Sequence, residues 1–372
     1  MKKFISIILL LFCYTILFAD ISDTDLRKKI AQMIITGFNG TEITQDNPVY
    51  DDIINGNISG VILFSKDVKK IKAKEKDTTK NIKSPKQLKK LIKQIKDLSP
   101  SKMFISIDEE GGQISRLSSS TGFNTETLSH KELGEKNDTE LTYKQAKKIA
   151  KTLNSLGINV NFAPCVDLAV NKESPIIYKK GRSFSDNPQT AAKHAQAYIQ
   201  AHNKYNILTV AKHFPGHGSA IGDSHNGFTD VSSTWEKKEL EPYITLNKKF
   251  LLNAVMVAHV YNKNLDKYYP ASMSGKMITR VLKQAIGFKG IVFSDDMQMK
   301  AISDNFSLEE SIITAINAGN DVLIFGNNLE YDKDIAKKFN DIVFNAVKDG
   351  RILQDRIEDA YNKITATKSF LK

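Results

Sequence analysis

The chain has 372 residues, of which 41% are hydrophobic and 26% charged, so it can bury a large core and is not an intrinsically disordered protein. Its formal net charge is +11. A basic protein can bind nucleic acid, but the eight lysines in the segment 66–83 have no aromatic residues among them, and we expect one solvated loop there. Nucleic acid is therefore not an expected partner, and anionic cell-wall material or membrane headgroups are favoured instead.

The first 19 residues differ from the rest of the chain. Lys2 and Lys3 precede an apolar run over 4–18, and Ala19 follows as a small residue, which is the pattern of a secretory signal peptide. The alternative is an uncleaved anchor tethered to the inner membrane, which the shortness of the run disfavours. Cleavage would leave a net charge of +9 and Cys165 as the single cysteine, so that no intrachain disulfide could form. We expect an exported, periplasmic protein, monomeric and without a stable membrane span after processing.

Eight short apolar runs recur along the chain and predict buried strands. Each is too short for an ordinary helix, is rich in Val, Ile and Phe, and is nearly continuous rather than alternating, as expected for strands covered on both faces. The runs are 33–38, 60–64, 103–108, 158–164, 207–214, 254–259, 290–295 and 321–325.

Between these runs lie segments with helical periodicity. They include 84–98, 140–156, 188–203, 276–286 and 308–318, and two further amphipathic segments, 334–347 and 354–367, end the chain. Eight alternations of strand and helix predict a closed, parallel (β/α)8 barrel (a TIM barrel), because an open sheet of this size would leave an edge. We expect residues 20–372 to form this one domain, since no linker rich in Pro, Gly or Ser divides them.

Ionisable residues gather where several of the predicted strands end. The third run ends in Asp108, the fifth contains Lys212 and His213, the sixth ends in His259 and the seventh in Asp295. Barrel enzymes build their active sites at the carboxyl ends of the strands and in the loops that follow. Because a buried strand needs no such cluster in order to fold, the sequence predicts a functional site at this rim.

The loop after the fifth run carries the most information. It reads Lys-His-Phe-Pro-Gly-His-Gly at 212–218 and Asp-Ser-His at 223–225, and its glycines and proline allow tight turns over a ligand. Asp223 can contact the imidazole of His225 and fix its tautomer, which suits proton transfer near neutral pH. An alternative is a metal site made by His213, His217 and His225 with Asp223, but the spacing matches no helical metal motif. We expect no metal and no cofactor.

These residues resemble glycoside hydrolase family 3, and in particular its single-domain bacterial β-N-acetylglucosaminidases, a kind of β-N-acetylhexosaminidase. The likeness rests on the loop at 212–225 and on four other segments in the expected order. These are Asp-Glu-Glu-Gly-Gly at 108–112 with Arg116, Asn-Phe-Ala-Pro at 161–164 with Asp167, Gly-Arg-Ser-Phe at 181–184, and Phe-Ser-Asp-Asp-Met at 293–297. The sequence differs from the family pattern at Glu109, where relatives often have Gln, and in the lysine-rich segment 66–83.

The resemblance implies a role for each matching residue. Asp295 would be the nucleophile, rather than Asp296; His225 would be the acid/base, and Asp223 the carboxylate that orients it. The residues that would hold the terminal sugar are Asp108, Arg116, Arg182, Lys212 and His213. The implied reaction is retaining hydrolysis of terminal β-1,4-linked N-acetylglucosamine from saccharides such as peptidoglycan fragments, through a covalent glycosyl-enzyme. The alternatives are a family 3 β-glucosidase, an N-acetylglucosamine phosphorylase, a metal-dependent hydrolase and a non-catalytic saccharide-binding barrel.

Overall fold

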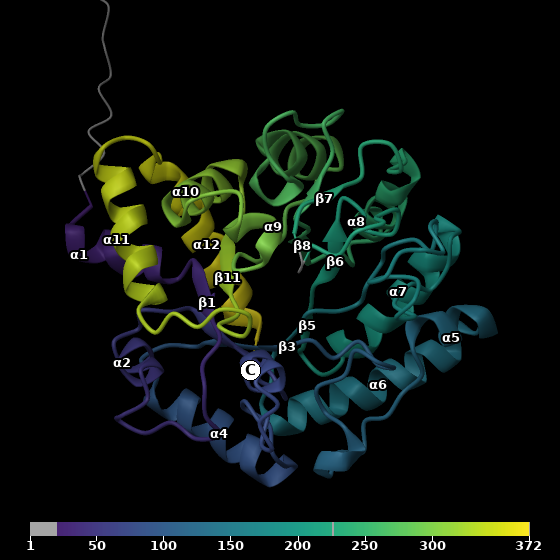
Figure 1. Ribbon diagram of the computed structural model, residues 1–372, viewed down its shortest axis with the longest axis horizontal. Helices are drawn as coiled ribbons and strands as arrows, with labels where there is room; N and C mark the ends of the chain where they lie inside the picture. Colours follow the sequence, from purple (N-terminus) through teal and green to yellow (C-terminus); the bar gives the residue numbers. More distant parts are fainter. Residues whose placement is uncertain (1–20, 225–226, 372) are drawn as a thin grey trace, which may run out of the picture.

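The computed structural model describes residues 21–224 and 227–371, which fold around one parallel β-sheet (Figure 1). Helices surround this sheet on its outer side. The nine strands are hydrogen-bonded in the order β5-β4-β3-β2-β1-β11-β10-β8-β6, and every pair is parallel. Their bounds are β1 Ile34–Thr36, β2 Gly60–Leu63, β3 Phe104–Ile107, β4 Val160–Asn161, β5 Leu208–Thr209, β6 Ala211–Phe214, β8 Ala254–Val257, β10 Ile291–Asp296 and β11 Val322–Phe325.

The sheet closes on itself through the fifth predicted run. This run forms two strands, β5 and β6, separated only by Val210; β5 pairs with β4, and β6 pairs with β8. An isolated parallel bridge between Cys165 and Lys212 joins the chain beyond β4 to β6. The two ends of the strand order are thus consecutive in sequence, and the expected (β/α)8 barrel is confirmed, with its fifth strand in two pieces.

All eight apolar runs contain barrel strands, and their side chains are buried as expected for a sheet covered on both sides. The rings of Phe104, Phe162 and Phe293 pack edge to face inside the barrel, with centroids 5.7 to 5.9 Å apart. A separate pair of two-residue strands, β7 (Thr229–Asp230) and β9 (Val260–Tyr261), lies in the loops after β6 and β8.

The predicted helices are present, and several shorter helices were not expected. The predicted ones are α4 Pro85–Leu98, α6 Thr139–Leu156, α7 Pro188–Asn203, α10 Leu308–Ala318, α11 Ile335–Lys348 and α12 Gln354–Phe370, while the segment Lys276–Ala285 is a π-helix. The further helices are α1 Asp23–Ala31, α2 Val49–Ile54, α3 Val68–Lys72, α5 His130–Lys136, α8 Glu241–Lys248 and α9 Lys300–Ser303.

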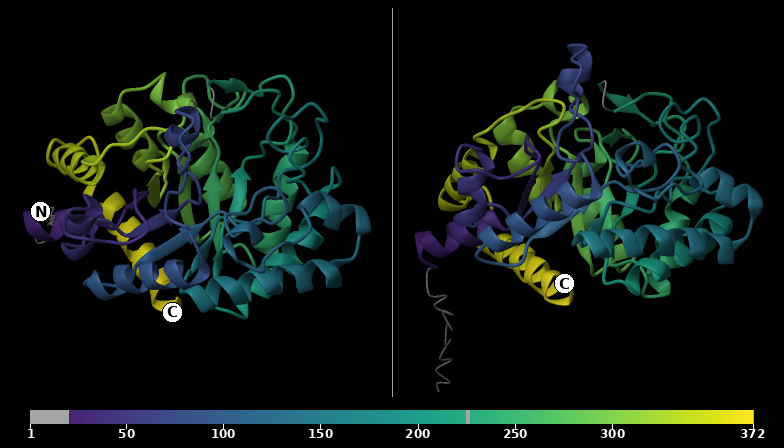
Figure 2. Two further views of the ribbon diagram at one scale, coloured as in Figure 1. Left: turned by 60° about the horizontal axis from the view of Figure 1, so that its bottom comes forward. Right: turned by 90° about the horizontal axis from the view of Figure 1, so that it is seen from below.

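The prediction of one solvated loop over 66–83 is wrong. The backbones of Lys66 and Thr79 form an antiparallel bridge, so residues 65–80 make a hairpin with α3 near its tip, and this lysine hairpin stands out from the rim of the barrel (Figure 2). Lys80 at its base is only 2% exposed. A buried lysine needs hydrogen-bond acceptors, and the backbone carbonyl of Asn327 provides one. Side-chain spacing in the sequence does not reveal that contact.

Within 21–224 and 227–371, no helix combines the length and apolar character needed to cross a membrane. The segment 1–19, for which the sequence predicts a signal peptide, lies outside the described residues.

Candidate active site

A cavity of about 470 Å³ opens at the carboxyl ends of the barrel strands. It contains Asp295 and all five residues that the sequence predicts to bind the sugar. Its walls are Ile62, Phe64, Ser65, Lys66, Val68, Asp108, Ile114, Ser115, Arg116, Phe162, Ile176, Lys180, Arg182, Lys212, His213, Met256, Asp295, Asp296, Met299, Ile324, Asn328 and Leu329. The strand ends β2, β3, β6, β8, β10 and β11 and their loops therefore converge on one space, as the barrel geometry requires.

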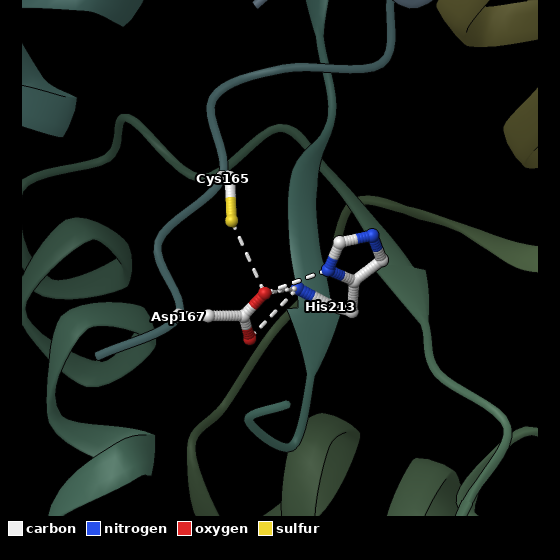
Figure 3. Close-up of side chains that lie close together, drawn as sticks. All are labelled: Cys165, Asp167 and His213. Atoms are coloured by element: carbon white, nitrogen blue, oxygen red, sulfur yellow. Dashed lines mark hydrogen bonds and ion pairs between the residues drawn. The ribbon is translucent and has the colours of Figure 1, made fainter. Parts of the chain in front are cut away.

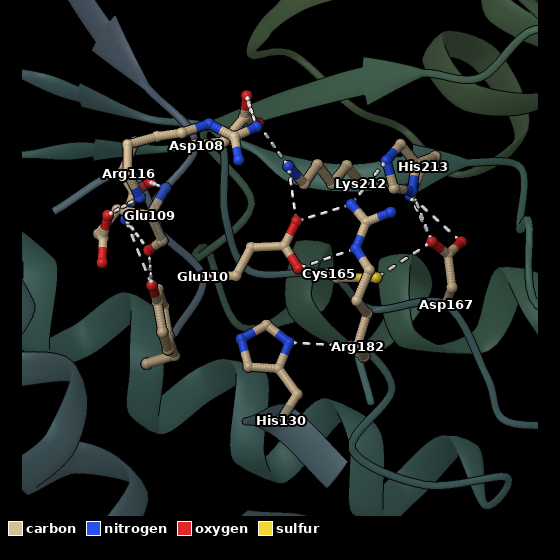
Figure 4. Close-up of polar contacts among 12 residues, drawn as sticks. Asp108, Glu109, Glu110, Arg116, His130, Cys165, Asp167, Arg182, Lys212 and His213 are labelled. Carbon is tan, nitrogen blue, oxygen red and sulfur yellow. Dashed lines mark hydrogen bonds and ion pairs between the residues drawn. The ribbon is translucent and has the colours of Figure 1, made fainter. Parts of the chain in front are cut away.

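Lys212 lines the buried part of the cavity, which we call its floor, and is 2% exposed; Figure 4 shows its side chain beside Asp108 and Glu110. Its Nζ is 2.7 Å from Oδ1 of Asp108 and 2.8 Å from Oε1 of Glu110. Burial alone would lower the pKa of Lys212, but the two carboxylates outweigh it and raise this pKa. Asp108 also faces the guanidinium of Arg116 at 3.4 Å. Burial opposes its ionisation, yet Lys212 and Arg116 lower the pKa of Asp108, so the floor holds fixed opposite charges.

Arg182 crosses the same floor and makes two hydrogen bonds to Glu110. Its Nε and Nη2 donate to the two carboxylate oxygens at 3.0 and 2.7 Å, the fork geometry that arginine forms with carboxylates. Although burial favours the neutral acid, Arg182 and Lys212 hold the pKa of Glu110 well below its usual range. Glu110 therefore fixes two of the predicted sugar-binding cations, a role that sequence reasoning did not assign to it.

His213 is fixed by contacts at both ring nitrogens. Its Nδ1 donates to Oδ2 of Asp167 at 2.6 Å, and Nη2 of Arg182 donates to its Nε2 at 3.2 Å. Together these contacts select the tautomer with a proton on Nδ1, because an arginine can only donate. Asp167 also accepts the backbone N–H groups of His213 and His217, which ties the start of the loop to the chain beyond β4.

Cys165, Asp167 and His213 form a buried group whose potential metal ligands lie within 4.8 Å of one another (Figure 3). The sequence did not suggest a role for Cys165 in such a group. Burial, followed by the charge of Asp167, raises the pKa of the Cys165 thiol well above its usual value, so the thiol donates to Asp167 at 3.2 Å. With Arg182 on the remaining ring nitrogen, the chemistry of these donors favours a hydrogen-bond network over metal ligation.

Glu109 does not face the sugar-binding residues. It is 0% exposed and accepts hydrogen bonds from the Ser115 hydroxyl at 2.6 Å and from the backbone N–H groups of Arg116 and Leu117 at 2.7 and 3.1 Å. Burial raises its pKa to about 7. The carboxyl group of Glu109 is therefore turned into the protein, where it holds the loop that carries Arg116.

The backbone of Glu109 is clamped from two other elements. The Asn161 side chain accepts from its N–H at 3.0 Å and donates to its carbonyl at 2.9 Å, while the Tyr198 hydroxyl on α7 donates to the same carbonyl at 2.7 Å. This clamp fixes the direction in which the neighbouring Asp108 and Glu110 leave the end of β3. It gives the Asn161 segment, which the sequence singled out without a function, a positioning role.

Asp295 and Asp296 end β10, and both line the cavity. The carboxylate of Asp296 accepts the backbone N–H groups of Gly326 at 3.0 Å and Gln298 at 3.1 Å, so it is tied to neighbouring loops. His259 does not line the cavity. Its Nδ1 lies 2.7 Å from the Ser272 hydroxyl, and its Nε2 lies 2.9 Å from the backbone carbonyl of Asp296, so it supports the end of β10 from behind.

The loop that carries Asp223 is held against the end of the barrel, whereas His225 lies outside the described residues. The backbone N–H of Ala301 on α9 donates to the carbonyl of Ser224 at 3.2 Å, which brings the loop beside the segment that follows Asp295. Asp223 is half-buried and is not among the cavity walls. Earlier in the loop, the Gly218 N–H donates to the buried Glu239 carboxylate at 3.1 Å.

Known proteins identify the family of this barrel. The family model for the glycosyl hydrolase family 3 N-terminal domain matches residues 25–367. The chain belongs to glycosyl hydrolase family 3. Family 3 members are glycoside hydrolases, and a barrel whose mouth gathers buried cations and carboxylates fits an enzyme of this kind.

Relatives of this family 3 domain are named for hexosamine substrates. It is 31% identical to Beta-hexosaminidase A of Pseudoalteromonas piscicida over 334 residues, covering 85% of this chain and 54% of that protein. It is 34% identical to a Beta-hexosaminidase of Psychromonas ingrahamii, covering 73% and 76% of the two chains. A family 3 β-N-acetylglucosaminidase from Paenibacillus superposes with a TM-score of 0.81 at 29% identity, covering 93% and 62%. The chain thus spans just over half the length of the first of these proteins.

Proposed function

We propose that this family 3 domain is a retaining exo-β-N-acetylglucosaminidase. The observation that carries the proposal is the cavity, in which the Asp295 carboxylate shares one enclosed space with Asp108, Arg182 and Lys212. A glycosidase needs a carboxylate at the anomeric carbon and several fixed polar groups for the hydroxyls of the sugar. The names of its hexosaminidase relatives support a substrate with an N-acetyl group.

The terminal sugar would occupy the floor of the cavity. Asp108 accepts hydrogen bonds from hydroxyls, while Arg116, Arg182, Lys212 and His213 present donors or ring atoms to hydroxyl and N-acetyl oxygens. Because Glu110 and Asp167 already hold Arg182, Lys212 and His213 in place, binding immobilises few additional side chains, which lowers its entropic cost.

Catalysis would proceed in two displacements at the anomeric carbon. Asp295 forms a bond to this carbon while the glycosidic bond breaks, and protonated His225, oriented by Asp223, gives its proton to the leaving oxygen. Neutral His225 then removes a proton from water, which attacks the same carbon and releases Asp295. Two inversions give net retention of configuration.

The natural substrate would be a saccharide ending in β-1,4-linked N-acetylglucosamine, such as a peptidoglycan fragment. We propose that residues 1–19 direct export to the periplasm and that residues 20–372 form the mature enzyme, because a charged start, an apolar run and Ala19 make up a secretory signal. We propose that this enzyme acts as a monomer.

The test compares aryl β-N-acetylglucosaminide with aryl β-glucoside as substrates of the mature protein. The proposal expects turnover of the N-acetyl substrate only, with kcat at least about a thousandfold lower in Asp295→Asn. Asp296→Asn is the matched control on the adjacent carboxylate and should lose much less. Turnover of the glucoside alone would identify a β-glucosidase, and formation of a sugar 1-phosphate in phosphate buffer would identify a phosphorylase. If folded protein cleaves neither substrate, a saccharide-binding barrel replaces this proposal.

A further inference from the structure

The lysine hairpin (residues 65–80) forms part of the wall of the catalytic cavity. Ser65, Lys66 and Val68 line that cavity, and Lys66 is exposed there. The segment 65–83 contains eight lysines against three acidic residues. Of these lysines Lys66 lines the catalytic cavity, whereas Lys70, Lys80 and Lys83 line a separate cavity, and the hairpin projects from the barrel (Figure 2).

The hairpin is a built structure that holds Lys66 in place. Its two arms are joined by a backbone hydrogen bond from Asp67 to Thr78 of 2.8 Å. Buried Lys80 donates to the carbonyl of Asn327, and Lys69 pairs with Glu330 at 3.2 Å. Both the base of the hairpin and α3 are thus bound to the loop after β11, which also lines the cavity. The backbone of Lys66 consequently has a defined position relative to the floor.

Two acidic residues of the hairpin, Asp67 and Asp77, line a separate cavity and not the catalytic one. The Asp67 carboxylate accepts the backbone N–H groups of Lys69 and Lys70 at 2.9 and 3.1 Å, capping α3. Asp77 lines a separate cavity with Asn39 and Lys83. Across the described residues, no ion pair within 4.0 Å engages Lys66.

Lys180, in the loop after β4, is the second exposed lysine of the catalytic cavity. The remaining charged residues of its wall are half-buried or buried, and they form the floor described above. An exo-acting enzyme holds the terminal sugar on the floor, so the rest of the bound substrate must extend out of the cavity along the exposed part of its wall. That path carries Lys66 and Lys180.

We propose that Lys66 and Lys180 form an outer subsite that selects substrates whose next sugar carries a carboxylate. This inference rests on the proposed exo-N-acetylglucosaminidase activity and adds the determinant of its aglycone. Two exposed ammonium groups attract a carboxylate without desolvating it fully, so the effect is modest for each lysine and decreases with added salt. A neutral aglycone gains nothing from them.

The experiment compares two disaccharides that differ only in charge. They are β-1,4-linked N-acetylglucosaminyl-N-acetylmuramic acid and its methyl ester. We expect wild-type protein to show a higher kcat/KM for the acid than for the ester by about fivefold or more, the size of one to two exposed ion pairs. In Lys66→Gln/Lys180→Gln this ratio should fall close to one. High salt should also lower the wild-type ratio towards one.

The control is Lys144→Gln/Lys147→Gln, which removes the same charge from exposed positions on α6, whose residues are absent from the cavity wall. This variant should keep the wild-type ratio. Two results would overturn the outer subsite and leave the proposed activity standing. One is a wild-type ratio near one with both disaccharides cleaved, and the other is an unchanged ratio in Lys66→Gln/Lys180→Gln. Failure of wild-type protein to cleave either disaccharide or the aryl N-acetylglucosaminide would instead overturn the activity itself.

Discussion

Two adjacent buried glutamates offer opposite responses to the same substitution. Glu109 and Glu110 are 0% and 2% exposed, but Glu109 accepts only from neutral donors whereas Glu110 contacts Arg182 and Lys212. Glutamine keeps the size of either side chain and removes its charge. At pH 8 we expect Glu110→Gln to destabilise the protein strongly and Glu109→Gln to stabilise it.

The magnitudes follow from the two environments. Removing one member of a buried ion pair leaves its partners uncompensated and costs about 3–5 kcal/mol, which we expect for Glu110→Gln. Burial raises the pKa of Glu109 from 4.5 to about 7, so its ionisation in the folded protein costs about 3 kcal/mol. The Glu109→Gln variant avoids that cost, because the carbonyl oxygen of the new amide can accept the two backbone N–H groups and its NH2 group can donate to Ser115.

The two variants also differ in how stability depends on pH. Because the folded pKa of Glu109 is raised, the wild type loses stability as pH rises from about 4.5 to 7, and Glu109→Gln removes this loss. The folded pKa of Glu110 is lowered, so its contribution is present above the unfolded pKa and disappears as pH falls through the folded one. Urea unfolding followed by circular dichroism between pH 4 and 8 measures the Glu109 effect, and the same measurement below pH 4 follows the loss of the Glu110 contribution. Equal destabilisation by the two substitutions at pH 8 would refute this reasoning.

Three other substitutions test the supports of the site. Tyr198→Phe removes the hydroxyl that donates to the Glu109 carbonyl, and calorimetry should show a loss of about 1 kcal/mol in the free energy of unfolding. No loss would show that Asn161 alone suffices to hold the Glu109 backbone. Burial raises the pKa of Glu239 to about 7, so Glu239→Gln should flatten the decline in melting temperature between pH 4.5 and 7; an unchanged slope would argue against it. A Cβ at Gly218 would lie 1.8 Å from the Leu168 carbonyl oxygen, and Gly218→Ala should therefore displace the loop and lower kcat/KM at least about tenfold, a prediction that full activity would contradict.

The sequence predicts the barrel well because its strands differ sharply from everything around them. Each of the eight apolar runs contains a strand, since only residues buried on both faces can be apolar without alternation. The break of the fifth strand at Val210 could not be predicted, because it depends on pairing with two different neighbours. The short helices α2, α5, α8 and α9 have four to eight residues, too few to show a clear helical period.

The predicted site residues come from the resemblance, and most of them lie together in the structure. Asp108, Arg116, Arg182, Lys212, His213 and Asp295 share one cavity. The sequence could not show which two acids of the Asp-Glu-Glu run face the cations, because the turn after β3 sets those directions. Nor could it show that Asp167 organises the loop through backbone N–H groups, since such contacts require no particular partner side chain.

The irregular strands β6 and β10 at the barrel mouth matter for any design that moves these active-site residues onto another barrel. A regular strand turns alternate side chains to opposite faces, so it can offer only one of two neighbours to a ligand. Here β6 and β10 both shift register against their partners, and each presents two consecutive residues to the cavity, Lys212 with His213 and Asp295 with Asp296. An idealised barrel with perfect alternation would lose half of these groups even if every residue were copied, so a designer would have to reproduce the irregularities before the side chains.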